Sequence, residues 1–253
     1  MRRRTFLLAS AIGTSTVAMS APPLRVLAYG DSNTWGLQPI QDGQDVPRYV
    51  DSIRWSGVLQ RTLAGECQVV TNGVLARTFN SDLRKGIAGL SGEDHNGIKR
   101  FPLALLAESP IHLVVVMLGG NDMMAKLDRS LVDIAAGVKQ YADIVAQATD
   151  EHAKVRGPRM LLVAPPPLGA VERGSFSDTF NAESVRKSEQ LGKALAGAAR
   201  EASVAFLDAG NLITTDGVDG VHLSVSAHRK LGLGIAKAVR PLIYLSTRPK
   251  SDA

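Results

Sequence analysis

In the stretch Leu24–Gly36, LRVLAYGDSNTWG, an apolar run ends at Gly30 and polar side chains follow at once. A run of this length that stops at glycine is typical of a buried strand leading into a turn. Ser32 lies in this turn, and a serine at such a place is a candidate nucleophile. Because a lone Gly-Asp-Ser also arises by chance, the hypothesis needs support from elsewhere in the chain.

Two further polar blocks supply that support. Residues 119–122 read GGND and directly follow the apolar run Leu113–Leu118. Residues 219–222 read DGVH and lie in a glycine-rich segment near the C-terminus. A serine after the first strand, an asparagine after a middle strand and a late Asp-x-x-His form one ordered set, which chance alone seldom produces.

These residue types suit nucleophilic catalysis. The ligand crevice of an open parallel sheet lies beyond the carboxyl ends of its strands, so we expect Ser32 and Asn121 there. Imidazole exchanges protons near neutral pH, which makes His222 the candidate base for Ser32. The three-residue spacing puts Asp219 on the same side of one turn as His222, where a carboxylate orients the ring.

Each of these residues also has a structural interpretation. Asp219 would cap the helix expected to begin near Ser224, His222 would be a satisfied polar group at a strand end, and Asn121 would bridge loops. A lone Asp-x-x-His favours this interpretation, whereas the complete ordered set favours catalysis.

The pattern of the whole chain predicts a parallel α/β fold. Five apolar runs of strand length lack strict alternation, as buried parallel strands do: Leu24–Tyr29, Cys67–Thr71, Ile111–Leu118, Met160–Ala164 and Val204–Leu207. Apolar residues at three- and four-residue spacing predict helices over Ser52–Leu63, Leu131–Ala148, Glu183–Ala202 and Ser226–Ile243. This alternation predicts a five-stranded parallel sheet covered on both faces, a three-layer, flavodoxin-like α/β/α domain.

Three connections are rich in turn residues: Gly36–Asp51, Phe79–Gly97 and Pro165–Ala182. Long loops at strand ends commonly form binding surfaces, so we expect them to wall a substrate pocket. The second, with four glycines, is either a mobile cover or a plain surface loop.

From about Leu24 to Ile243 the chain resembles the SGNH or GDSL-type hydrolases, whose serine, Gly-x-Asn-Asp and Asp-x-x-His blocks match those quoted above. It is more narrowly similar to the arylesterase and acyltransferase branch. The segments that carry this similarity are GDSNTWG, RWSGVL (Arg54–Leu59), GVLART (Gly73–Thr78), VAPPPL (Val163–Leu168) and TTDGVDGVH (Thr214–His222). Asn33 stands where the family has leucine.

The resemblance implies a serine esterase without a cofactor, acting on small acyl esters through an acyl-enzyme on Ser32. It implies oxyanion donors in the backbone N–H groups of Ser32 and Ala76 and the side-chain amide of Asn121. Many relatives have glycine where this chain has Ala76. Alanine is acceptable there because the donor is the backbone N–H and not the side chain. Acyl transfer to alcohols or peroxide is an implied side activity, and relatives in this branch form homo-oligomers.

Other residues near these blocks receive lesser roles. We expect Asp31 and Asp122 to accept hydrogen bonds from loop N–H groups. Trp35, together with the adjoining Asp31, is assigned to the substrate pocket, although an aromatic residue after a strand is also ordinary core. Trp55 lies within a helical pattern and is assigned to the core or an interface.

Several alternative chemistries are disfavoured. The remaining histidines lack metal-site spacing, so no metal is expected; they are His95, His112, His152 and His228. Cys67, the one cysteine, begins an apolar run and is a small core residue by this reading. A Gly-x-Ser-x-Gly elbow is absent from the sequence, which argues against the α/β-hydrolase fold. The Gly232-Leu233-Gly234 run lies in a helical pattern, so no nicotinamide cofactor is expected.

The first 20 residues, MRRRTFLLASAIGTSTVAMS, resemble a cleaved secretory signal, with features of the twin-arginine type. We expect export to the periplasm or medium and one domain over residues 21–253; the alternative is a cytoplasmic enzyme with a basic tail. Removing the three leader arginines from 29 basic residues leaves 26 against 24 acidic ones. So small a surplus disfavours a nucleic-acid partner, and no apolar stretch is long enough to span a membrane.

Two other functions stay open. One is O-deacetylation of a carbohydrate such as acetylated xylan by the same triad. The other, from a different class, is a binding protein that keeps the fold without turnover.

Overall fold

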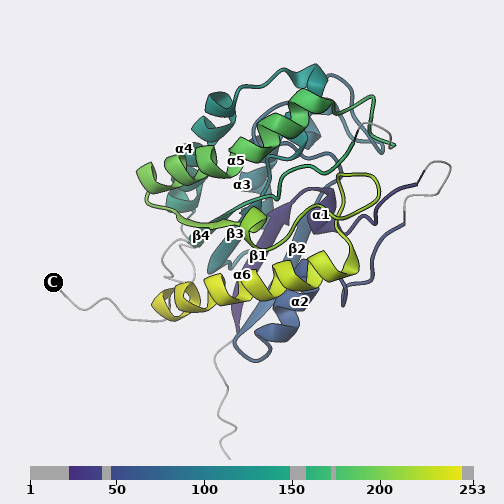
Figure 1. Cartoon of the computed structure of the whole chain (residues 1–253). Helices are drawn as coiled ribbons and strands as arrows, with labels where there is room; N and C mark the ends of the chain where they lie inside the picture. Colours follow the sequence, from purple (N-terminus) through teal and green to yellow (C-terminus); the bar gives the residue numbers. More distant parts are fainter. Residues whose placement is uncertain (1–22, 42–46, 149–157, 172–174, 247–253) are drawn as a thin grey trace, which may run out of the picture.

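The protein forms a three-layer α/β/α structure around one parallel sheet (Figure 1). The computed structural model describes residues 23–41, 47–148, 158–171 and 175–246; the expected leader lies outside them. The strands are β1 (Leu24–Gly30), β2 (Cys67–Gly73), β3 (Leu113–Met117), β4 (Arg159–Ala164) and β5 (Ala205–Asp208). All neighbouring pairs are parallel and their order is β2-β1-β3-β4-β5.

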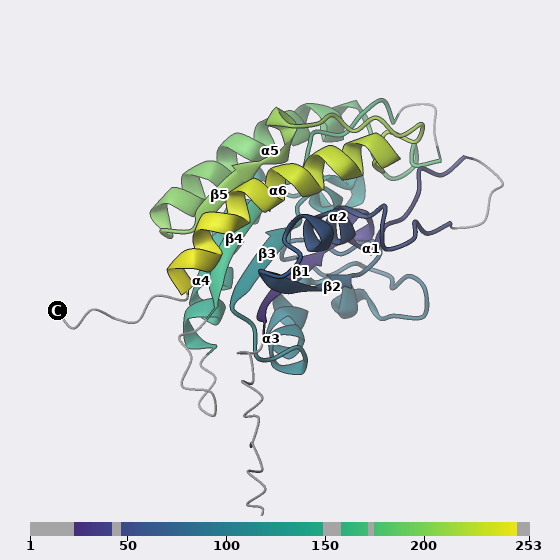
Figure 2. The same cartoon turned by 90° about the horizontal axis from the view of Figure 1, so that it is seen from below.

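Helices cover both faces of the sheet. The described α-helices are α1 (Ser32–Trp35), α2 (Trp55–Thr62), α3 (Gly97–Ala107), α4 (Leu131–Gln147), α5 (Ala182–Glu201) and α6 (Val225–Ser246). Figure 2, viewed from below, shows α2 and α6 on one face and α3 and α4 on the other. The apolar side chains of α5 belong to the same core as those of α3 and α4. The predicted three-layer, five-stranded fold is therefore confirmed.

The strands alternate between two hydrophobic cores, as a period of two requires. On β3, Val114 and Val116 point toward α3, α4 and α5, whereas Val115 points toward α2 and α6. Apolar residues are needed on both faces, because helices cover both. This explains why the sequence of each central strand reads as one continuous apolar run.

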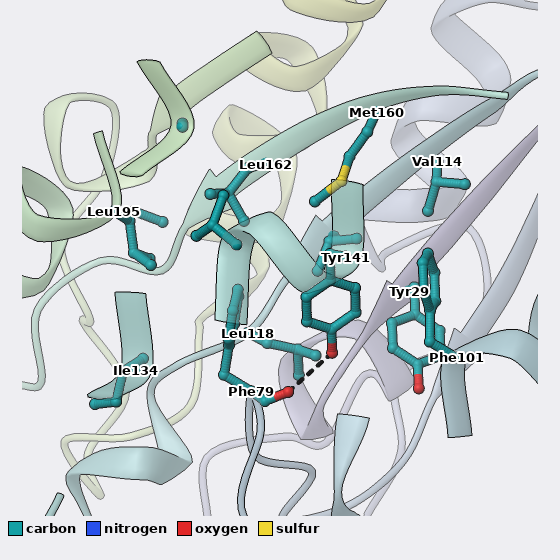
Figure 3. Close-up of a cluster of buried hydrophobic side chains, with 14 of the residues drawn as sticks. Tyr29, Phe79, Phe101, Val114, Leu118, Ile134, Tyr141, Met160, Leu162 and Leu195 are labelled. Atoms are coloured by element: carbon teal, nitrogen blue, oxygen red, sulfur yellow. Dashed lines mark hydrogen bonds between the residues drawn. The ribbon is translucent and has the colours of Figure 1, made fainter. Parts of the chain in front are cut away.

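Buried aromatic side chains of the first core carry polar groups that are satisfied by backbone. The hydroxyl of Tyr141 donates to the carbonyl of Phe79 at 2.9 Å, and the hydroxyl of Tyr29 donates to the carbonyl of Gly97 at 2.7 Å. The ring of Phe101 packs against both tyrosine rings, with its centroid about 5 Å from each (Figure 3). These contacts fasten the loop after residue 78 to the core.

The sequence analysis assigned no element to α3. The helix begins at a glycine and contains Pro102, and both residues weaken a helical pattern. The side chain of Asn96 caps it by accepting the N–H of Lys99, and the buried face includes Phe101 and Leu105. Tertiary packing thus outweighs local propensity here.

No helix in the described ranges is both long and apolar enough to cross a membrane.

Candidate active site

The polar side chains singled out in the sequence gather where the chain order of the strands reverses. Ser32 follows β1, Ala76 follows β2 and Asn121 follows β3, and these three strands are neighbours in the sheet. Crevices of doubly wound sheets form at this switch point beyond the strand ends. The topology therefore explains why residues distant in sequence meet.

The turn after β1 is set by close packing and by a cap. A Cβ on Gly30 would lie 2.0 Å from the Oγ1 of Thr34, so only glycine fits there. Asp31 is the N-cap of α1, and its Oδ1 accepts the N–H of Asn33 at 2.9 Å. Ser32 is consequently the first residue of a short helix, with its side chain buried.

Ser32, His222 and Asp219 form a continuous hydrogen-bonded chain. The Oγ of Ser32 lies 3.0 Å from Nε2 of His222, whose Nδ1 lies 2.7 Å from Oδ2 of Asp219. All three side chains are at most 5% exposed. Because the carboxylate is an acceptor, Nδ1 carries a proton, and Nε2 is the free acceptor for the serine proton.

Asp219 is held as an anion by its surroundings. Burial by itself would raise the pKa of this carboxyl, but hydrogen bonds from the side chain and backbone of His222 and from Ile40 lower it to about 2. Asp219 does not cap a helix: α6 begins at Val225, and the hydroxyl of Ser224 accepts the N–H of Ala227. The geometry thus fits the catalytic interpretation and not the capping one.

Three residues that line one pocket carry the candidate oxyanion donors. The N–H of Ser32 stands in the first turn of a helix, where it has no intrahelical acceptor. The N–H of Ala76 is bonded to no other described residue. Asn121 uses one amide hydrogen on the carbonyl of Arg77 at 3.0 Å, which leaves its second hydrogen free. Ser32, Ala76 and Asn121 all line the pocket.

The guanidinium of Arg77 fixes the segment that carries Ala76. It donates to the carbonyls of Gly30 and Asn72 at 3.0 and 2.9 Å, and it lies 4.1 Å from the centre of the Tyr29 ring. One buried side chain thereby joins the ends of β1 and β2. Ala76 itself has a φ of +54°, in the left-handed region that favours glycine.

The pocket above Ser32 has a volume of about 490 Å³. All three turn-rich connections contribute to its wall, as the sequence analysis expected. The segment after β3, residues 124–127, lines it as well, which was not expected. Its apolar wall consists of Leu37, Ile40, Leu75, Leu83, Ile87, Met124, Leu127, Phe176, Phe180 and Val221.

Neither Trp35 nor Asp31 lines this pocket, so their assignment to its wall is corrected. Trp35 is the last residue of α1 and lies beneath the guanidinium of Arg48, 4.4 Å from the ring centre. The helical turn of α1 carries its side chain away from Ser32. Trp55 is completely buried in the core against α6, as expected.

Two residues near the triad escaped sequence reasoning. The ring of Phe176 packs against that of His222, with centroids 5.4 Å apart, and borders the pocket. Asn33 accepts the N–H of Leu223 at 3.1 Å and donates to the carbonyl of Val221 at 3.2 Å. The Asn33 side chain is therefore hydrogen-bonded to the backbone on both sides of His222. Its departure from the family leucine was the available signal, and Phe176 had none beyond its position in a long loop.

Burial raises the pKa of two carboxyl groups near the site, those of Asp31 and Asp122. Burial raises the pKa of Asp31 to about 6 and that of Asp122 to about 7, against the opposing effect of backbone N–H donors. Asp122 accepts the N–H of Phe79 at 2.6 Å, and Asp31 that of Asn33. Asp122 accepts a loop N–H group, the role predicted for both residues, whereas Asp31 accepts an N–H group in the first turn of α1.

His95 and Cys67, which the sequence analysis disfavoured as metal ligands or nucleophiles, are buried and have structural contacts. Nε2 of His95 accepts the N–H of Ile87 at 3.1 Å, and its Nδ1 donates to the carbonyl of Leu75 at 2.8 Å. Cys67 is buried at the start of β2, where burial raises its thiol pKa to about 11. Within the described ranges, no three His, Cys, Asp or Glu side chains are grouped so as to hold a metal ion; His152 lies outside those ranges.

Comparison with known proteins agrees with this geometry. Residues 28–230 match the GDSL-like lipase/acylhydrolase family. The structure resembles an aryl esterase from M. smegmatis at 34% identity and a TM-score of 0.79, covering 87% of this chain and 99% of the esterase. A carbohydrate acetylesterase from Sinorhizobium meliloti gives 33% identity, a TM-score of 0.79 and the same coverage. A search of curated protein sequences gives no match.

The matched region includes the serine turn, the Asn121 segment and the Asp219–His222 turn. This region spans most of the chain, and solved relatives that cover 87% of it exceed 30% identity. The chain belongs to the GDSL-like lipase and acylhydrolase family and is a carboxylic ester hydrolase of the SGNH fold.

Proposed function

We propose that the protein is a serine esterase that hydrolyses short-chain aryl or alkyl esters through an acyl-enzyme on Ser32. The observation that carries this proposal is the hydrogen-bonded chain from Ser32 through His222 to Asp219 at the floor of an apolar pocket. A pocket of about 490 Å³ is at the small end of ligand sites, which suits a compact ester.

In the proposed reaction, Oγ of Ser32 attacks the ester carbonyl carbon while Nε2 of His222 takes the hydroxyl proton. Negative charge develops on the carbonyl oxygen, where the N–H groups of Ser32 and Ala76 and the amide of Asn121 can donate. His222 returns the proton to the departing alkoxide, which leaves an acyl ester on Ser32. Water, activated by His222, then releases the acid and restores the hydroxyl.

The charge of Asp219 supports the imidazolium that forms in each step. An anion with a pKa of about 2, in hydrogen-bond contact with Nδ1, stabilises the positive ring while keeping its tautomer. Phe176 packs against the imidazole, which is only 2% exposed, and this contact limits access of water to the ring.

A series of para-nitrophenyl esters from acetyl to octanoyl tests the proposal, with the full chain and its Ser32→Ala variant. We expect the highest kcat/KM for short acyl groups and a loss of at least about 10³-fold in the variant. Rapid-quench mass spectrometry should find one acetyl group on the wild-type chain and none on the variant. Equal rates in both proteins would remove Ser32 as the nucleophile.

A carbohydrate O-deacetylase using the same triad is the second candidate, because one of the similar structures is a carbohydrate acetylesterase. Release of acetate from acetylated xylan, measured beside para-nitrophenyl acetate, separates the two. Acyl transfer is proposed as a side activity because the largely apolar wall reduces the water around an acyl-enzyme. Benzyl acetate formation from vinyl acetate and benzyl alcohol measures it.

Export by the N-terminal 20 residues is also a proposal. It rests on the basic and apolar pattern of that segment. N-terminal sequencing of the protein recovered from a periplasmic extract should begin at Ala21, whereas a chain that begins at Met1 or Arg2 would contradict cleavage.

A further inference from the structure

The pocket has a buried catalytic floor and a charged, exposed rim. Ser32, Asn121 and His222 are each at most 7% exposed. Four charged side chains that line the same pocket are exposed: Arg84, Lys85, Lys126 and Asp178. Three cations and one anion give this rim a net charge of +2 from the residues that the structure describes.

The three rim cations are not neutralised within the described part of the chain. Arg84, Lys85 and Lys126 form no ion pair or side-chain hydrogen bond with another described residue. Some cations elsewhere on the surface are paired, such as Lys99 with Asp82 and Lys139 with Asp143, both at 2.7 Å. The rim therefore carries three positive charges that no acidic side chain in the described ranges neutralises through an ion pair.

Two segments bring these cations together. Arg84 and Lys85 belong to the connection between β2 and α3, and Lys126 belongs to the segment after β3. Less exposed residues of the same two segments that line the pocket are apolar, such as Leu83, Met124 and Leu127. A ligand that fills the pocket thus meets apolar side chains in its depth and positive charge at its entrance.

We propose that the preferred ester substrate carries a carboxylate, which the Arg84, Lys85 and Lys126 rim attracts and binds while the ester group reaches Ser32. This proposal rests on the proposed esterase function and names its substrate class. Charges that line a cleft raise the local concentration of an oppositely charged ligand, and the effect weakens with salt. Asp178 on the same rim opposes it.

Two pairs of esters, matched for size, test the proposal. In one, 4-acetoxybenzoate is compared with neutral 4-acetoxybenzamide, which puts the charge on the alcohol side. In the other, mono-4-nitrophenyl glutarate is compared with 4-nitrophenyl pentanoate, which puts it on the acyl side. The readout is the ratio of kcat/KM for the anionic and the neutral ester, so general changes in the enzyme cancel.

In at least one pair, we expect this ratio to fall about twofold in Arg84→Gln, Lys85→Gln or Lys126→Gln, and about five- to tenfold in the triple variant. The fall should lie mainly in KM. Asp178→Asn should raise the ratio, because it removes the opposing charge. Raising the NaCl concentration from 20 to 500 mM should lower the wild-type ratio toward that of the triple variant, since screening shortens the range of the attraction.

The control is Lys139→Gln, which removes an exposed cation on α4 far from the rim and should leave the ratio unchanged. Wild-type and triple-variant ratios that agree for both pairs would overturn the proposal. If neutral esters were still hydrolysed through Ser32 in that case, the esterase function would stand. Failure to hydrolyse any of the four esters would overturn both.

Discussion

Two buried aspartates near the active site, Asp219 and Asp122, differ in pKa and in the hydrogen bonds that they accept. Asp219 receives bonds from both the ring and the backbone of His222 and from the N–H of Ile40, which keep its pKa at about 2. Asp122 is equally buried, but Oδ1 has no partner among the described residues, and burial raises its pKa to about 7. Burial favours the neutral acid unless donors compensate for lost water.

The raised pKa of Asp122 predicts a pH-dependent stability. Its carboxyl ionises near pH 4 in the unfolded chain and near pH 7 in the folded one, so the folded state holds the proton more tightly. Stability from this group is therefore present at low pH and is lost as the pH rises from about 4 to 7. Asp122→Asn removes this dependence.

Urea unfolding at pH 5 and pH 8 measures the effect. The free energy of unfolding should fall between these pH values by on the order of 2 kcal/mol more in the wild type than in Asp122→Asn. Parallel pH profiles for the two proteins would contradict the raised pKa.

Ala76 carries backbone strain at a position where its N–H is a candidate oxyanion donor. Its φ of +54° is a left-handed conformation that costs an alanine about 1 kcal/mol relative to glycine. Ala76→Gly should raise the free energy of unfolding by up to about 1 kcal/mol and keep kcat within about threefold, because the donor belongs to the backbone. Thermal unfolding and ester kinetics check both.

Ser203→Gly is the matched control, since Ser203 has a φ of +55° in the turn between α5 and β5. It should raise stability by a similar amount without changing kcat. A kcat loss above about 100-fold in Ala76→Gly alone would show that the Cβ, and not only the N–H, matters at this position.

At the level of secondary-structure elements, α1 joins the segment after β1 to the turn that carries His222. Asn33 lies on α1 beside Ser32, and its amide bonds both neighbours of His222 in the turn before α6. The nucleophile and the base are therefore held by one side chain in addition to their own contact. The sequence analysis noted Asn33 only as a departure from the family leucine, because nothing local reveals a partner 190 positions away.

Asn33→Leu should lower kcat for short esters about three- to thirtyfold while KM changes less than threefold. It removes two hydrogen bonds, each worth about 1 kcal/mol, that orient the backbone around His222. Asn33→Asp, which keeps the acceptor for Leu223, should have an intermediate kcat at pH 8. A lower melting temperature with unchanged kcat in both variants would assign Asn33 to stability alone.

The boundaries of most elements could be predicted because their patterns are local. The five strand predictions agree with the structure to within two residues at each end, and α4 and α5 to within one. The prediction for α2 began three residues early, since Ser52 and Ile53 continue the apolar spacing but form a turn. The omission of α3 has the opposite cause, because its glycine and proline conceal a helix that packing stabilises.

Across the whole molecule, the first core and the active-site loops form one network. The hydroxyl of Tyr141 on α4 donates to the carbonyl of Phe79 (Figure 3). The N–H of Phe79 donates to Asp122, which follows β3. Tyr141 and Phe79 are both buried, so loss of the bond between them would leave the Phe79 carbonyl without this donor. The position of the loop after residue 78 thus depends on a helix on the far side of the core.

Tyr141→Phe should lower the free energy of unfolding by about 1 to 2 kcal/mol, measured in urea. Val132→Ala on the same helix is the control; Val132 is 78% exposed, and its loss should change stability by less than about 0.5 kcal/mol. Equal effects of the two substitutions would contradict a structural role for the buried hydroxyl.

Local pattern was enough to predict the sheet, its layers and the grouping of Ser32, Asn121, Asp219 and His222 at one edge. The reason is that parallel topology sends the carboxyl ends of all strands to the same edge, so residues after those strands must approach one another. Resemblance to a known family added Ala76, which lines the pocket and whose N–H is bonded to no other described residue.

The wall and rim of the pocket depended on side-chain directions that no local pattern encodes. Trp35 follows Ser32 closely, yet one helical turn directs it to Arg48, whereas Phe176 reaches His222 from a distant loop. The gathering of Arg84, Lys85 and Lys126 likewise arises only when the connections after β2 and β3 pack together. Loop residues lack periodicity, so long-range packing alone determines which of them face the substrate.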